Sequence, residues 1–101
     1  MTAVLRGNLQ KRMEDARAEL LRAREALRVL DEQVAFQQGV ADDAETAAVV
    51  AETPLAHRER READGDLQRL RTQRDELRER IAALVAEQDE LLDRLLEQSN
   101  G

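Results

Sequence analysis

Three carboxylates lie within four residues of one another and are the first candidates for chemistry in this chain. Asp42, Asp43 and Glu45 form its tightest acidic set, and oxygen ligands of this kind are what hard cations such as Ca²⁺ prefer. Helix capping explains two of the three equally well, because Asp42 as N-cap with Glu45 three residues later resembles a capping box. We therefore predict no metal site and no cofactor.

Nucleophilic catalysis would need a nucleophile and a base that the fold brings together. His57 is the only histidine and Ser99 the only serine, and there is no cysteine for thiolate chemistry or disulfides. Ser99 lies close to the end of the chain, where we expect fraying. We predict that the chain is not an enzyme and that His57 is an exposed polar residue near a helix start.

Composition points to long helices. The chain has 101 residues, of which 38% are charged, with one Phe and neither Trp nor Tyr. It cannot build a broad globular core, and this composition is typical of a coiled coil or a long helical hairpin. The net charge of −6 argues against nucleic-acid binding. No apolar run approaches a membrane span and the start lacks a signal-peptide core, so we expect a cytoplasmic protein with no membrane partner.

Two ladders of core positions alternate steps of three and four residues. The first comprises Leu9, Met13, Ala16, Leu20, Ala23, Leu27, Leu30 and Val34; the second comprises Ala63, Leu67, Leu70, Arg74, Leu77, Ile81, Leu84, Gln88, Leu91 and Leu95. Such spacing gives each helix a narrow apolar seam that another helix must cover. The predicted fold is an all-α antiparallel coiled-coil hairpin over residues 1–101, as a single domain.

Local signals divide this hairpin into three helices. We predict a helix over about 2–38 with Gly39 as its stop, a short helix across the tip over about 42–51, and a return helix over about 54–98. Thr53 would cap the return helix with Pro54 at its first position, and Gly65 would bend it. An apolar set off the seam should form a small cluster under the tip helix: Phe36, Val40, Val49, Val50 and Leu55.

The two ladders can be aligned in one favourable register. Leu30 then faces Leu67 and Leu20 faces Leu77, while the small Ala23 leaves room for Arg74. On one flank, two oppositely charged pairs form across the helices: Glu19 with Arg80, and Arg12 with Glu87. A slide of one heptad would turn both pairs into like-charge contacts, which favours the first register.

The same register leaves two features unexplained, a flank rich in arginine and a wide apolar stripe near the C-terminus. On the other flank, Arg17 approaches Arg78 and Arg24 approaches Arg71; these side chains either splay into water or form a basic strip for an acidic partner, unless the register is wrong. Near the C-terminus, Val85, Leu92 and Leu96 widen the apolar stripe beyond what one hairpin buries. This widening favours self-association as a dimeric four-helix bundle.

The amino-acid composition is also similar to that of a known group of proteins. All basic residues except Lys11 are Arg, and Ala and Leu are abundant. With the segment from Val40 to Leu55, the chain resembles short coiled-coil hairpin proteins of GC-rich Gram-positive bacteria. The likeness covers most of the chain and implies no particular function.

A second resemblance concerns the acidic residues. The order Asp42, Glu45, Ala47 is similar to the acidic hairpin tip of secondary-channel regulators of bacterial RNA polymerase, the Gre-type and DksA-type factors. In those families, tip carboxylates act near the active-site magnesium. Here the second acid is Glu, and no zinc finger or globular body accompanies the hairpin. Three functions stay open: a protein–protein interaction module acting as scaffold or regulatory adaptor for an unidentified protein, a polymerase-channel regulator, and a holdase-like hairpin that grips clients with its ends.

Overall fold

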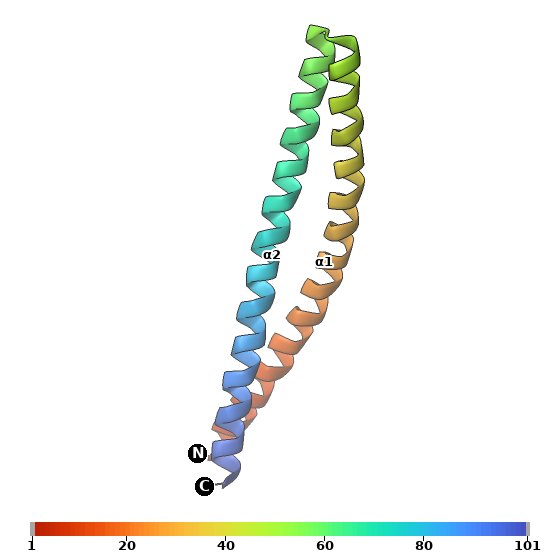
Figure 1. Ribbon diagram of the computed structural model, residues 1–101. Coiled ribbons are helices and arrows are strands. Elements are labelled where there is room, and N and C mark those ends of the chain that lie inside the picture. Colours follow the sequence, from red (N-terminus) through yellow and green to blue (C-terminus); the bar gives the residue numbers. More distant parts are fainter. Residues whose placement is uncertain (1, 101) are drawn as a thin grey trace. The chain divides into compact units, whose positions relative to one another are not determined.

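Two long α-helices account for almost all of the chain. The computed structural model describes residues 2–100. Helix α1 spans Thr2–Ala51 and helix α2 spans Pro54–Asn100, with Glu52 and Thr53 between them (Figure 1). No strand occurs in this described range. The predicted all-α helical hairpin is confirmed.

Helix α1 passes through Gly39 without a break, so the prediction of a stop there and of a separate short helix over 42–51 is wrong. A glycine inside a helix costs only about 1 kcal/mol relative to alanine. The buried seam continues on both sides of it, from Val34 to Ala41 and Ala48, and this packing outweighs the cost. Helix α2 likewise runs through Gly65.

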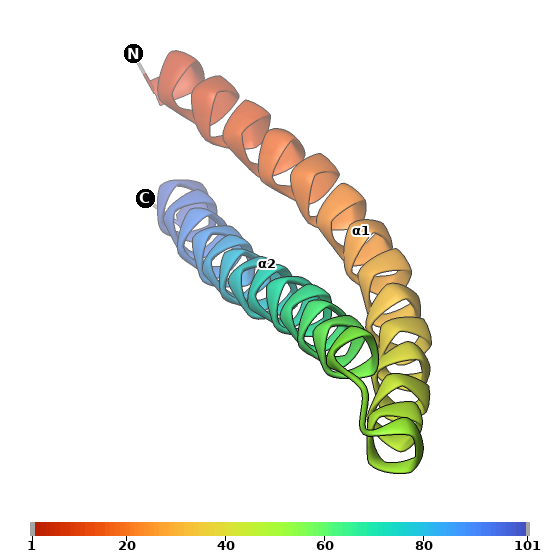
Figure 2. The same cartoon turned by 90° about the horizontal axis from the view of Figure 1, so that it is seen from above.

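The connection between the helices is two residues long and is capped on both sides (Figure 2). Glu52 adopts a positive φ of 51°, and its N–H donates to the carbonyl of Ala48 at 3.0 Å, which is the left-handed C-terminal cap that glycine usually provides. The amide of Ala56 donates to Thr53 Oγ1 at 3.1 Å, and Pro54 takes the first helical position. The predicted start of the return helix is confirmed.

The chain divides into two compact units, each containing a piece of both helices. We call Met1–Ala26 with Leu77–Gly101 the terminal unit, and Leu27–Glu76, which contains the connection, the turn unit.

The terminal unit has a core of large residues. Leu20, Ala23 and Leu84 form its buried cluster, with Leu77, Ile81 and Val85 packed against it. On one flank, Arg80 Nε donates to Glu19 Oε1 at 2.9 Å, and Arg12 lies 4.0 Å from Glu87. Both predicted cross-helix ion pairs are therefore present.

The turn unit has a core of smaller residues. Its buried cluster contains Val34, Ala41, Ala63 and Leu67, with Ala44 and Leu70 packed against it. Gln37, at a seam position, donates from Nε2 to the carbonyl of Ala63 at 3.2 Å. Small side chains and this polar bond fill the space between the helices.

The predicted apolar cluster under a tip helix is wrong. Its five members are exposed, by 75% at Phe36, 38% at Val40, 70% at Val49, 80% at Val50 and 62% at Leu55. Because α1 continues straight through 42–51, no separate helix crosses over these side chains. They therefore form part of the outer surface of the turn unit.

Candidate protein-interaction surface

The predicted C-terminal apolar stripe lies on one side of α2 in the terminal unit. Arg78, Val85 and Leu92 are spaced seven residues apart, so they share one helical face, and Leu96 lies one turn beyond Leu92. Val85 is half-buried and packs against the core, whereas Leu92 is 44% and Leu96 53% exposed. The two leucines form a small apolar surface that no other residue of this unit covers.

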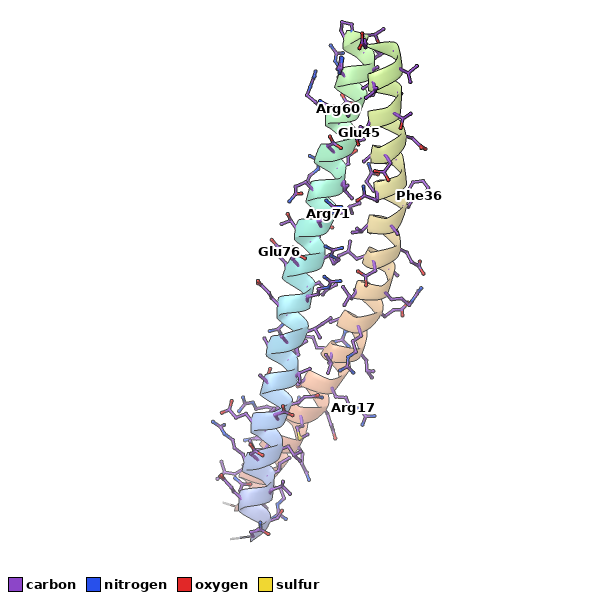
Figure 3. The ribbon with its side chains drawn as sticks, viewed as in Figure 1. Arg17, Phe36, Glu45, Arg60, Arg71 and Glu76 are labelled. Atoms are coloured by element: carbon purple, nitrogen blue, oxygen red, sulfur yellow. The ribbon has the colours of Figure 1, made fainter. Side chains whose placement is uncertain are left out.

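The surface of the terminal unit also carries basic residues, and on α2 Arg78 lies 14 residues before Leu92. Arg17 and Arg24 on α1 are exposed and also lie seven residues apart, with Leu21 between them. The side chain of Arg17 points away from α2 (Figure 3). Arg78 on α2 is exposed and also interacts within the chain. Three of the four arginines of the predicted basic strip thus belong to this unit and reach its surface.

The fourth arginine of the strip, Arg71, belongs to the turn unit and differs from the others. Its side chain is half-buried and directed toward α1 (Figure 3). There its guanidinium donates a hydrogen bond to Gln38 Oε1. An Arg–Gln pair leaves no charge pattern in the sequence, so this bond could not be predicted.

The acidic residues lie on the side of α1 and not at the connection. Asp42, Asp43 and Glu45 are exposed (Glu45 in Figure 3), and Asp42 lies nine residues before Ala51, which is about 14 Å along a helix. Asp42 does not cap a helix: its carboxylate accepts from Gln38 Nε2 at 2.9 Å, and its carbonyl accepts from Thr46 Oγ1 at 3.1 Å. Within residues 2–100, no group of three or more potential ligands could hold a metal ion.

His57 and Ser99, the two residues considered for catalysis, each make a hydrogen bond at one end of α2. His57 is half-buried, not exposed as predicted, in the first turn of α2, where its backbone N–H donates to the carbonyl of Thr53 at 3.1 Å. Ser99 Oγ donates to the carbonyl of Leu95 at 3.0 Å, inside the last turn of α2, where we had expected fraying.

A second apolar surface, which the sequence analysis missed, lies on the turn unit. Val29, Phe36 and Val40 are exposed along one side of α1, and Phe36 points away from α2 (Figure 3). An open groove of about 430 Å³ follows this side; Val29, Glu32, Gln33, Phe36, Gln37 and Leu70 line it. The sequence does contain a signal for this surface, because Val29 and Phe36 lie one heptad apart and therefore share a helical face.

Comparisons with protein-family models, with curated proteins and with solved structures each found no match for this chain. None of the helices within residues 2–100 is long and apolar enough to cross a membrane. What the described surfaces offer is exposed leucine, valine and phenylalanine beside arginine. In protein interfaces generally, side chains of these kinds contribute through apolar burial and ion pairing.

Proposed function

We propose that this chain is a protein–protein interaction module, a small cytoplasmic scaffold or regulatory adaptor that works as a coiled-coil homodimer. One observation supports this function: large apolar side chains are exposed in both units although each unit already has a buried apolar cluster between its helices. They comprise Val4, Leu5, Leu21, Leu92 and Leu96 in the terminal unit and Val29, Phe36, Val40, Val49, Val50 and Leu55 in the turn unit. Contiguous exposed apolar residues mark interaction sites.

The terminal unit is where we propose that an unidentified protein binds. A partner helix that covered Leu92 and Leu96 would gain roughly 1.5–3 kcal/mol for each side chain fully buried. Arg17, Arg24 and Arg78 would favour a partner with acidic residues beside its apolar face. This is the recognition of an amphipathic helix by an apolar surface with a charged rim.

The test compares two double variants of the purified protein. A partner is first captured with the wild-type chain, identified and purified, and its affinity is then measured for both variants. Leu92→Glu with Leu96→Glu should weaken binding by about a hundredfold or more, because a loss of about 3 kcal/mol corresponds to that ratio. Asp42→Asn with Glu45→Gln, a matched pair of exposed changes on α1, should leave binding unchanged. Equal affinity for the wild type and the leucine variant would exclude this surface.

The alternative function, regulation of RNA polymerase through an acidic tip, makes the opposite prediction. It requires binding to fail in the Asp42→Asn, Glu45→Gln variant and to survive the leucine changes. Its support is weaker, because the three carboxylates lie along the side of α1. A titration of the purified protein against bacterial RNA polymerase that shows no binding would rule it out.

A further inference from the structure

A second heptad ladder runs along the outside of α1 in the turn unit. Its positions alternate steps of four and three residues, and we call them the outer stripe: Val29, Gln33, Phe36, Val40, Asp43 and Ala47. All six residues are exposed. This is the spacing with which one helix packs against another, yet α2 covers a different face of α1, the one that carries Val34 and Ala41.

The outer stripe is symmetric about its centre. Read from either end, its positions are apolar, polar, apolar, apolar, polar, apolar. A second copy laid antiparallel on the stripe would place Phe36 against Val40, Gln33 against Asp43 and Val29 against Ala47, each pair occurring twice. We infer that the outer stripe binds the outer stripe of a second copy of this chain in this antiparallel alignment.

Other alignments of the same two helices are less favourable. A parallel pair would bury Asp43 against its own copy, and two carboxylates held together without a counter-charge repel each other. Sliding the antiparallel pair by one heptad would set Phe36 against Gln33 in one direction, or Val40 against Asp43 in the other. Each leaves a polar group facing an apolar one, and a polar group buried without a hydrogen bond is costly. Only the inferred alignment pairs like with like.

The flank of the stripe is compatible with this pairing. In the terminal unit, Glu19 and Arg80 show which flank positions meet across an antiparallel pair. The same relation in the dimer would bring Glu32 beside Thr46 of the second copy and Gly39 beside Gly39. Neither contact joins like charges, and a Cβ atom added at Gly39 meets nothing within 4 Å, so the flank has room for a second helix.

The groove along the stripe gives the second helix a further contact. Leu70 of α2 lines this groove together with Val29 and Phe36 of α1. A helix lying on the outer stripe could therefore touch both helices of the turn unit, which is the arrangement of a four-helix bundle. The inference rests on the proposed homodimer and specifies the surface and the alignment that form it.

Crosslinking through single cysteines tests the alignment directly, since the natural chain has no cysteine. Gly39→Cys lies at the centre of the inferred dimer; Gly7→Cys is its matched control, because both are helical glycines with nothing within 4 Å of an added Cβ. A short bis-maleimide should convert Gly39→Cys to covalent dimer and leave Gly7→Cys monomeric. Adding Phe36→Glu to Gly39→Cys should abolish the crosslink while circular dichroism still reports a helical protein.

The other outcomes separate this inference from the proposed function. If the wild type sediments as a dimer but only Gly7→Cys is crosslinked, the dimer forms through the terminal unit; the inference is then wrong and the proposed homodimer stands. If crosslinking of Gly39→Cys survives Phe36→Glu, the stripe does not form the interface. A wild type that sediments as a monomer at all accessible concentrations would contradict both.

Discussion

The two units follow one heptad pattern but fill it with side chains of different size. The most buried residues of the terminal unit are Leu84 and Leu91, at 0% and 1% exposure. The turn unit instead buries Ala41 and Ala48, each 2% exposed, together with Ala56 and Ala63. A buried leucine contributes roughly 1.5–3 kcal/mol, and an alanine much less, so we expect most of the hydrophobic stabilisation to come from the terminal unit.

Both units also expose large apolar side chains, which are mainly leucines in the terminal unit. The turn unit exposes its one phenylalanine and a row of valines, and its α2 seam carries Arg60 and Arg74, whose Nε atoms are buried without a hydrogen-bond partner. Arg74 Nε retains only an ion-pair contact with Asp75 at 3.6 Å. An identical periodicity therefore produces a core of mainly large residues in the terminal unit and a core with more alanines and two arginines in the turn unit.

The largest expected effect is on the terminal unit. Leu84→Ala should destabilise the protein by about 2–5 kcal/mol, because it removes a fully buried leucine and leaves a cavity. Leu92→Ala, the same change at a position 44% exposed, should cost much less. Urea unfolding followed by circular dichroism measures both, and equal losses would contradict the core assigned to this unit.

A larger side chain at a buried alanine tests whether the core of the turn unit is tightly packed. Ala41→Leu should cost roughly 1–3 kcal/mol, since the added atoms have no space between closely packed helices. Ala35→Leu, on the exposed side of α1, is the control and should change the free energy of unfolding little. If Ala41→Leu stabilised the protein, the turn unit would contain a void, and its small residues would not indicate tight packing.

A glycine in the connection between the helices should stabilise the protein. Glu52 holds a positive φ, a conformation that costs non-glycine residues roughly 1–2 kcal/mol. Glu52→Gly should therefore stabilise the protein by about 1 kcal/mol. Glu45→Gly, inside α1, should destabilise it by a similar amount. A destabilised Glu52→Gly variant would mean that the left-handed cap does not form in solution.

The smallest effect concerns the ion pair of the terminal unit. A double-mutant cycle on Glu19→Ala and Arg80→Ala should give a coupling free energy of roughly 0.2–1 kcal/mol, because both side chains are about half exposed to solvent. High salt should reduce it. Zero coupling at low salt would argue against the alignment of the two helices in this unit.

Much of the fold could be predicted, because the features that determine it are periodic or local. The alternating steps around Leu20 identify a seam whatever the surroundings, and one alignment fixes the Glu19–Arg80 pair. Thr53 followed by Pro54 is a local start signal that needs no tertiary information. These predictions were confirmed.

The wrong predictions for residues 36–51 have one physical cause, the position of the helix end. Gly39 does not end α1, because a glycine ends a helix only where a left-handed residue is needed, and here Glu52 is that residue. Continuing α1 then carried Asp42 away from any cap and left Phe36 exposed. The bond between Arg71 and Gln38 depends on side-chain conformations that spacing does not encode.

We expect a second copy of the chain to cover the outer stripe of the turn unit. Sedimentation equilibrium of three proteins tests it most directly: the wild type, Phe36→Glu, and Ala35→Glu as an exposed neighbour off the stripe. We predict a concentration-dependent dimer for the wild type and Ala35→Glu, and a monomer for Phe36→Glu. A monomeric wild type, or a Phe36→Glu variant that dimerises as strongly as the wild type, would contradict this expectation.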